Sequence, residues 1–367
     1  MSVKGIIFAS DREVKLNELT IHRTTTSLPY GSRYRLIDFA LSNFVNSGVT
    51  SVGIIARKNY ESLMDHIRMG RDWDLNRKNA GIAVFPPLSF GSGEISKGKV
   101  DSLYGIMSYL VNAKEDYVYL TNGNLAINVD INDVVAKFEK TNADIVIMAH
   151  EAIPSTSRRV VLEVDDTDKV TDILISEGYT STRQLVSLGA YLIKRELLIS
   201  LVQSAYQRNQ MDFEKDILQR KVGSLQTYSY VVDCAYVIDD IKSYYNASMQ
   251  LLNDEVRDEL FYSNGRIYTK VKDSAPTIYK EGAEVSNSLI ADGCIINGKV
   301  TNSILFRGVV VEEGAEIVDS IVMEKGYISK GSKLSHVITD KQVHVAEDRV
   351  LSGTETYPIV VAKGKNV

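Results

Sequence analysis

The chain has 367 residues, enough for one large domain and a smaller one with well-buried cores. Hydrophobic residues make up 44% of it and charged residues 24%, ordinary values for a globular protein, and the formal net charge is −5. An acidic chain without basic runs argues against a nucleic-acid or membrane surface, and no apolar stretch approaches the roughly 18 residues of a membrane span.

The two cysteines, Cys234 and Cys294, form no Cys-x-x-Cys motif and cannot make a disulfide framework. We expect both thiols to be reduced and buried. The N-terminus has no signal-peptide pattern. The sequence therefore predicts a cytoplasmic protein with neither nucleic acid nor a membrane as its partner.

Strand-like and helix-like patterns alternate through the first two thirds of the chain. A short buried strand at 6–8 is followed, after a long loop, by a helix from Leu36 to about Gly48. Asn59, Asp101 and Asp240 are placed to cap later helices. This alternation is typical of a mostly parallel sheet covered by helices. Further strands are predicted at 51–56, 81–85, 117–121 and 144–149, strand-like runs at 160–191, and helices at 59–69, 101–114, 131–140, 194–206, 213–221 and 241–252, the last ending the domain.

The loop between the first strand and the first helix is unusual for its position. In nucleotide-binding α/β domains this loop is rich in glycine, because backbone N–H groups must approach the phosphates closely. Here it begins Ala9-Ser10-Asp11-Arg12-Glu13-Val14-Lys15, without a glycine and with two carboxylates where an anion would bind. The sequence therefore predicts that the phosphate site is lost.

A change of pattern follows residue 262. Asn264-Gly265 predicts a hairpin turn before the domain junction at Pro276. Beyond it, apolar positions recur six residues apart, glycines are frequent, and polar–serine pairs recur about every 15–17 residues at Ser288, Ser303 and Ser320, with Ser335 continuing the series. This repeat predicts a parallel β-helix with glycines at its corners; the alternative is a β-sandwich. We expect one domain at 1–262 and the β-helix at 276–367.

The segment from Pro29 to Asn43 resembles a long signature of the ADP-glucose pyrophosphorylases (glucose-1-phosphate adenylyltransferases). It reads Pro-Tyr-Gly-Ser-Arg-Tyr-Arg-Leu-Ile-Asp-Phe-Ala-Leu-Ser-Asn, against Pro-x-Gly-Gly-x-Tyr-Arg-x-Ile-Asp-Phe-x-Leu-Ser-Asn in the family. The resemblance implies an α/β fold in which a Rossmann-like (GT-A-like) nucleotidyltransferase domain precedes a left-handed parallel β-helix.

The family's phosphate-binding loop is replaced in this chain. Active members carry Gly-Gly-x-Gly-x-Arg-Leu and then Arg-Ala-Lys-Pro. Aligned with these motifs, Ser10, Asp11 and Glu13 replace the three glycines, and Lys15 replaces the arginine. The second motif becomes Arg23-Thr24-Thr25-Thr26, so its lysine is lost. This pattern is similar to the family's accessory D-type subunit in bacterial glycogen synthesis.

The family's metal and sugar-phosphate residues are also missing. Ser-Gly-Asp-His at a strand end becomes Thr121-Asn122-Gly123-Asn124, which has no carboxylate. The aspartate of Trp-x-Asp falls on Val237, although a slip of one or two residues would bring Asp239 to it. The Phe-x-Glu-Lys-Pro motif that holds the sugar phosphate has no lysine or proline equivalent at 170–178. We therefore predict no catalytic, cofactor-binding or metal-binding residue in this chain.

Three further motifs survive in altered form, and packing or capping accounts for each of them. Residues 98–102, Gly-Lys-Val-Asp-Ser, resemble the family's Gly-Thr-Ala-Asp-Ala helix start. Residues 187–191, Ser-Leu-Gly-Ala-Tyr, resemble Ser-Met-Gly-Ile-Tyr, and residues 212–216, Asp-Phe-Glu-Lys-Asp, resemble Asp-Phe-Gly-x-Asp. The matches concentrate in scaffold and the mismatches in chemistry.

These features favour a catalytically impaired regulatory subunit of glycogen biosynthesis. The resemblance implies a heterotetramer with a catalytic ADP-glucose pyrophosphorylase subunit, which would bind ATP and Mg²⁺, while this chain needs no cofactor. A second hypothesis is a nucleotidyltransferase that is active by itself through displaced ligands, for which Lys15, Arg23, Arg33 and Asp239 are the candidates. Whether the chain alone has any activity is left open. A third hypothesis, a hexapeptide-repeat acyltransferase with His336 or His344 as base, gives the large N-terminal domain no role.

Overall fold

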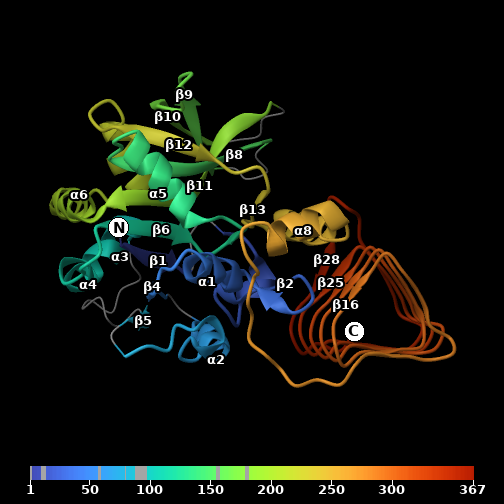
Figure 1. Cartoon of the computed structure of the whole chain (residues 1–367). Helices are drawn as coiled ribbons and strands as arrows, with labels where there is room; N and C mark the ends of the chain where they lie inside the picture. The colour runs from blue at the N-terminus through green and yellow to red at the C-terminus, as the bar shows by residue number, and fades with distance from the viewer. Residues whose placement is uncertain are drawn as a thin grey trace.

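The computed structural model describes residues 2–9, 14–56, 59–78, 80–86, 97–153, 158–177 and 182–367. The chain forms an α/β domain and a prism of stacked coils beside it (Figure 1). The N-terminus lies at the middle of the α/β sheet, and the C-terminus lies at the coils. The predicted loss of the phosphate loop at Ser10, Asp11 and Glu13 falls outside the described residues.

A mixed sheet, nine-stranded in the described part of the chain, is the centre of the N-terminal domain. Its strand order is β10-β9-β11-β6-β1-β4-β5, and β8 joins β11 to β12. Strand β1 lies parallel to β4 and β6, whereas β11 runs antiparallel to β6. The strands are β1 (Val3–Phe8), β4 (Ser51–Ile55), β5 (Gly81–Phe85), β6 (Tyr117–Asn122), β8 (Ile145–Ala152), β9 (Arg158–Val164), β10 (Val170–Glu177), β11 (Gln184–Lys194) and β12 (Thr227–Val231).

Helices cover both faces of this sheet, and each face has its own apolar cluster between the helices and the strands. On one face α1 (Leu36–Asn46), α2 (Glu61–Ile67) and α5 (Ile131–Lys140) pack against the strands. On the other face lie α3 (Lys99–Gly105), α4 (Met107–Val111), α6 (Arg195–Gln207) and a π-helix at Phe213–Gln219. Two short strands, β7 (Leu125–Ile127) and β13 (Ala235–Val237), pair at the edge from which α7 (Ile241–Gln250) and α8 (Asp254–Tyr262) follow.

Three details of the predicted helices differ. The helix at 241–252 is not the last of the domain, since the Asn253 side chain caps α8 by accepting from Glu255 N at 2.8 Å. Asn59 is not a cap, because its amide donates to Ile21 O at 2.8 Å and Tyr60 takes the N-cap position. Asp101 lies inside the first turn of α3, and the helix predicted to 114 breaks into α3 and α4. The prediction for Asp240 is confirmed, because its carboxylate accepts from Ser243 N at 2.7 Å.

The connection between the domains contains no hairpin. Asn264-Gly265 instead docks against the loop after β7: Asn264 Nδ2 donates to Asn128 O at 3.0 Å, and Asn128 Nδ2 donates to Gly265 O at 2.9 Å. The residues from 266 to 277 then run without helix or strand to the first coil, as the long orange trace in Figure 1 shows. Asn264-Gly265 therefore contacts a loop that is distant in the sequence and does not join two paired strands.

The C-terminal domain is the predicted left-handed parallel β-helix, and the β-sandwich alternative is wrong. Three five-stranded parallel sheets form the sides of a triangular prism (Figure 1). Its interior is a continuous column of aliphatic side chains that includes Val300, Ile317 and Leu334. The sheets are β14 (Ile278–Tyr279), β17 (Ile295–Ile296), β20 (Val310–Val311), β23 (Tyr327–Ile328) and β26 (His344–Val345); β15 (Glu284–Ser286), β18 (Lys299–Thr301), β21 (Glu316–Val318), β24 (Lys333–Ser335) and β27 (Val350–Ser352); and β16 (Leu289–Ile290), β19 (Ile304–Leu305), β22 (Ile321–Val322), β25 (Val337–Thr339) and β28 (Ile359–Val361).

The recurring serines form a ladder at one corner of the prism. Each serine hydroxyl of one coil accepts a backbone N–H from the next coil at 3.1 Å, in the steps Ser303 to Ser288, Ser320 to Ser303 and Val337 to Ser320. Val337 thus takes the position that we assigned to Ser335, because Ser335 lies opposite Val318 in the register of β24 and β21. The spacing of the serines therefore predicted the length of one coil. The fourth position of the series is Val337 and not Ser335.

Glycine makes only part of the corners. Gly293 and Gly308 have positive φ (78° and 68°), as predicted, but the same corner in later coils is made by Lys325 and Gln342 at 59° and 60°. At the serine corner, the positive-φ residues are Asn287, Asn302, Asp319 and His336. Asn and Asp tolerate this conformation better than other residues with a side chain.

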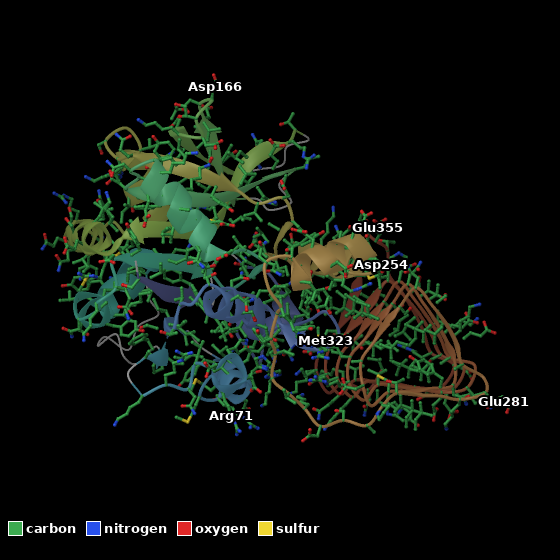
Figure 2. The ribbon with its side chains drawn as sticks, in the orientation of Figure 1. Arg71, Asp166, Asp254, Glu281, Met323 and Glu355 are labelled. Atoms are coloured by element: carbon green, nitrogen blue, oxygen red, sulfur yellow. The ribbon has the colours of Figure 1, made fainter. Side chains whose placement is uncertain are left out.

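One sheet of the prism packs against the N-terminal domain through apolar side chains. Ile304, Ile321 and Ile338 from β19, β22 and β25 share a cluster with Tyr30 and Tyr244 of the N-terminal domain. Figure 2 shows another member of this cluster, Met323, where the prism meets the α/β domain. Because this cluster is continuous, the two domains are expected to unfold together.

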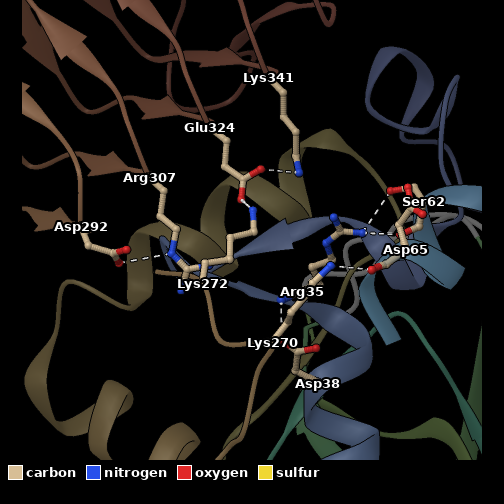
Figure 3. A network of polar contacts seen from close by, with 10 residues as sticks. All are labelled: Arg35, Asp38, Ser62, Asp65, Lys270, Lys272, Asp292, Arg307, Glu324 and Lys341. Atoms are coloured by element: carbon tan, nitrogen blue, oxygen red, sulfur yellow. Dashed lines mark hydrogen bonds and ion pairs between the residues drawn. The ribbon is translucent and has the colours of Figure 1, made fainter. Parts of the chain in front are cut away.

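A network of polar contacts borders this apolar junction (Figure 3). Glu324, after β22, lies 2.7 Å from the ammonium groups of both Lys272 and Lys341. Burial would raise the pKa of Glu324, but the two ammonium groups outweigh it and lower this pKa to about 2. Burial and the nearby Arg35 guanidinium lower the pKa of Lys341 to about 8. Glu324 is therefore the counter-charge of two ammonium groups at the junction, those of Lys272 and Lys341.

Replacing this anion should destabilise the protein in a pH-dependent way. Because folding lowers the Glu324 pKa, its ionised form stabilises the folded chain above the unfolded pKa of roughly 4.3, and that contribution is lost as the pH falls towards about 2. Glu324→Gln is expected to lower the free energy of unfolding by about 3 kcal/mol near pH 6 and by almost nothing near pH 2. Urea unfolding across this pH range measures both.

Glu316→Gln provides the matched control. Glu316 pairs with Lys333 at 3.2 Å on the outside of the prism, where the side chains are 46% and 56% exposed. Such a pair contributes less than about 1 kcal/mol. If Glu324→Gln lowered the free energy of unfolding by the same amount at every pH, lost packing and not lost charge would be responsible.

None of the helices in the described part of the chain is long and apolar enough to cross a membrane. Cys294 is buried and Cys234 is half-buried, and both are free thiols.

Candidate functional site

A cleft of about 960 Å³ lies beside the central sheet of the N-terminal domain. Asn122 and Asn124 reach it from the end of β6, Gly189 from β11, Arg159 from β9 and Lys99 from the start of α3. At Gly189 φ is +68°, and a Cβ there would collide with the Asn122 side chain. The carboxyl ends of parallel strands are where α/β proteins bind their ligands, so this cleft is the candidate site.

The inner wall of the cleft carries neutral amides. Asn124 Nδ2 donates to Asp239 Oδ1 at 2.6 Å, so the nearest carboxylate is already engaged by a side chain. One oxygen on each of Asn122 and Asn124 is buried without a hydrogen-bond partner among the described residues. The described residues contain no group of three or more His, Cys, Asp or Glu side chains that could hold a metal ion.

This wall does not fit Mg²⁺, which the resemblance would require for activity. Mg²⁺ is usually held by one or two carboxylates together with substrate phosphates. Here two neutral amides stand at the strand end, and Asp239 lies against one of them. Among the described residues, the strand end therefore lacks the free carboxylate that would hold Mg²⁺ beside a nucleotide.

Two arginines of β9 face the cleft near the segment that has lost the sugar-phosphate lysine. Strand β9 is antiparallel to β10, with Arg159 opposite Ser176 and Arg158 opposite Glu177. Arg158 donates to Asp212 Oδ2 at 2.7 Å, and Arg159 Nε donates to Gln184 Oε1 at 3.1 Å. Both cations thus have protein partners.

Two further residues that line the cleft, His150 and Cys234, have little reactivity. Burial and the Arg183 guanidinium lower the pKa of His150, so its ring is neutral at pH 7. Burial raises the pKa of the Cys234 thiol to about 11, with smaller contributions from Glu259 and Asp233. Since the thiolate is the nucleophile, this cysteine is unreactive at neutral pH.

The inner end of the cleft holds an ion pair that links three elements. The Lys99 ammonium contacts the Glu214 carboxylate, and Tyr191 Oη donates to Glu214 Oε1 at 3.0 Å. Lys99 begins α3, Glu214 lies in the π-helix and Tyr191 lies in β11.

Two family models match successive parts of the chain. A nucleotidyl transferase family model matches residues 4–254, and a model of the GlmU-like C-terminal hexapeptide matches residues 275–355. The chain belongs to the nucleotidyl transferase family.

This chain is similar, along almost its whole length, to a glycogen biosynthesis protein and to glucose-1-phosphate adenylyltransferases. The chain is 29% identical over 364 residues to the glycogen biosynthesis protein GlgD of Bacillus subtilis, covering 98% of this chain and 95% of the relative. It is 29% identical over 374 residues to the glucose-1-phosphate adenylyltransferase of Bacillus mycoides, and 28% identical to that of Bacillus cereus, with 98% of each chain covered. The resemblance to the ADP-glucose pyrophosphorylases and to their D-type subunit is thereby confirmed.

Two of the four candidate residues lie at the nucleotidyl transferase cleft or beside it. Asp239 lines the cleft against Asn124. Lys15 N donates to Asp239 O at 2.6 Å, which brings the two backbones together, while the Lys15 side chain is exposed. Val237, on which the family's aspartate falls, also lines the cleft.

The other two candidates lie elsewhere. Arg23 is buried at the domain junction, where it donates to both carboxylate oxygens of Asp340 at 2.8 and 3.0 Å. Arg33 is exposed, and its guanidinium lies 5.3 Å from the centre of the Tyr34 ring. Neither is among the described residues that line the cleft.

The histidines of the third hypothesis lie on the prism, not in the nucleotidyl transferase cleft. His344 Nε2 is 3.0 Å from Ser329 Oγ, and His336 Nδ1 is 3.0 Å from Ser335 Oγ.

Sequence reasoning missed several residues of the cleft. Arg158-Arg159 stands at the start of an apolar strand, a position where two adjacent cations are unusual. Lys99 and Glu214 were visible as departures from the family's threonine and glycine, but only the fold shows that they meet. The fold brings Lys99 and Glu214 together although they are 115 positions apart in the chain.

Proposed function

We propose that this chain is a catalytically impaired regulatory subunit that assembles with an active glucose-1-phosphate adenylyltransferase. The observation that carries the proposal is a large cleft at the strand ends whose described lining lacks the carboxylates that the family's motifs would place there. Neutral amides stand at the end of β6, and the side chains of Asp239 and Arg158 are engaged by other side chains. Removing one preorganised charge-stabilising group typically costs about 10²–10³ in rate.

The name of one relative, the glycogen biosynthesis protein GlgD, supports a role in glycogen biosynthesis. In the proposed complex the catalytic homologue binds ATP, Mg²⁺ and glucose 1-phosphate and forms ADP-glucose. This chain then acts by contacts that differ between a less active and a more active state of its partner. We propose a heterotetramer as the assembled form.

Asp239 favours the alternative, a transferase that is active by itself. It lies at the cleft beside Asn124, where a displaced ligand would be needed. The contact with the Asn124 amide weighs against it, since Asp239 alone would have to replace the two aspartates of the family's motifs.

Co-expression with the catalytic homologue tests the proposal. The mixed oligomer should be isolated by a tag on this chain, and its composition measured by native mass spectrometry. A coupling of about 1–3 kcal/mol would change apparent substrate or effector affinity by about 5–150-fold relative to the catalytic homologue alone.

The control is the catalytic homologue purified with an unrelated tagged protein and assayed at the same concentration of catalytic subunits. Identical kinetics per catalytic subunit, or the absence of a mixed species by mass, would contradict the regulatory proposal.

A further inference from the structure

A buried carboxylate at the inner end of the cleft lies between a cation and a phenol. The Lys99 ammonium contacts Glu214 and lies 5.8 Å from the centre of the Phe8 ring at the end of β1. Tyr191 Oη donates to the same carboxylate at 3.0 Å. The Lys99 and Glu214 side chains are only 13% and 8% exposed. A buried carboxylate thus accepts from an ammonium and a phenol, the kinds of donor that bind phosphate oxygens.

Lys99 and Glu214 are reciprocal departures from the motifs this chain otherwise resembles. Where the patterns have threonine in Gly-Thr-Ala-Asp-Ala and glycine in Asp-Phe-Gly-x-Asp, this chain has Lys99 and Glu214. Either change alone would leave one charge of this buried pair without the other. Glycine at 214 would leave the Lys99 ammonium and the Tyr191 hydroxyl without this carboxylate.

The charge state of Glu214 agrees with this geometry. Burial would raise the pKa of Glu214, but the Lys99 ammonium, a hydrogen bond from Lys99 and the Tyr191 hydroxyl outweigh it and hold this pKa below its ordinary value. The carboxylate is therefore ionised at neutral pH and neutralises the lysine. An incoming phosphate would have to displace a covalently tethered anion at high effective concentration.

We propose that Glu214 is an internal ligand: it occupies an anion site formed by Lys99 and Tyr191 and excludes small phosphates and sugar phosphates from the inner cleft. The proposal deepens the proposed function, on which it rests, because it names a built-in contact that keeps the cleft of a regulatory subunit free of the partner's substrate. The π-helix that carries Glu214 is a conformation frequent at functional sites.

Binding of inorganic phosphate and of glucose 1-phosphate to the full chain tests the proposal. Glu214→Gln keeps the size of the side chain and removes its charge, so the Lys99 ammonium loses this counter-charge. We expect it to bind both anions about 10–100-fold more tightly than the wild type, measured by calorimetry. Lys99→Met/Glu214→Gln should lose this gain, because the cation that receives the phosphate is gone.

Glu259→Gln is the matched control, since Glu259 lines the same cleft from α8. It should bind no more tightly than the wild type. Glu214→Gly is a second vacating variant, and thermal unfolding establishes that each variant is folded. Lys99→Met should bind phosphate as weakly as the wild type, because Lys99 is already neutralised.

Equal phosphate affinity in folded Glu214→Gln and wild type would overturn the proposal, and so would wild-type binding that depended on Lys99. These measurements use this chain alone. Failure here would therefore leave the mixed-oligomer result unaffected, and failure to form a mixed oligomer would not change the phosphate affinities.

Discussion

Purified alone and supplied with ATP, Mg²⁺ and glucose 1-phosphate, this chain is expected to form ADP-glucose at least about 10³-fold more slowly than a catalytic relative. The physical reason lies in the cleft. Gly123 falls on the aspartate of the family's Ser-Gly-Asp-His motif, and the Asn122 and Asn124 amides on either side of it are neutral. The Asp239 carboxylate is engaged by the Asn124 amide. Glu214 holds Lys99, the cation at the inner end.

Product formation should be followed by chromatography at matched protein concentration. The glucose-1-phosphate adenylyltransferase of Bacillus mycoides is the positive control. Asp239→Asn distinguishes residual chemistry from contamination, because a trace of co-purified enzyme would be insensitive to it. Turnover within about tenfold of the catalytic relative, abolished by Asp239→Asn, would establish the displaced-ligand alternative.

Asp340→Asn is expected to lower the free energy of unfolding by about 3–5 kcal/mol. Asp340 is fully buried, and the Arg23 side chain that pairs with it is 3% exposed. The pair joins the loop before α1 to the prism, 317 residues apart in the chain. Asparagine keeps the shape but leaves the guanidinium buried without its counter-charge, and Arg23 Nη1 already has no hydrogen-bond partner among the described residues.

Urea unfolding by circular dichroism measures this loss. Arg23→Met/Asp340→Leu should be destabilised less than Asp340→Asn, because removing both charges removes the desolvation penalty. Glu313→Gln, at an exposed pair with Lys330 whose side chains are 70% and 64% exposed, should change the stability by less than about 1 kcal/mol. A loss below about 1 kcal/mol for Asp340→Asn would mean that water reaches the junction and solvates Arg23.

The sequence by itself determined the two architectures. Alternating strand and helix patterns predicted the α/β domain, because apolar periodicity is a local property of each element. The bounds of α5 at Ile131–Lys140 and of β5 at Gly81–Phe85 are those predicted. The spacing of Ser288, Ser303 and Ser320 likewise predicted the prism, since a repeated coil must repeat its corner residues.

What only the tertiary structure decided is which distant side chains meet. Arg23 reads as a candidate ligand in the sequence, yet it pairs with Asp340 across the domain junction. Lys99 and Glu214 read as separate departures from two motifs, yet packing of α3 against the π-helix makes them one ion pair. Asn264-Gly265 has the composition of a hairpin turn, but it forms no hairpin, and the Asn128 amide donates to the Gly265 carbonyl instead. Local propensity and spacing carry no information on such pairings, because their free energy comes from desolvation and contact between elements that are far apart in the chain.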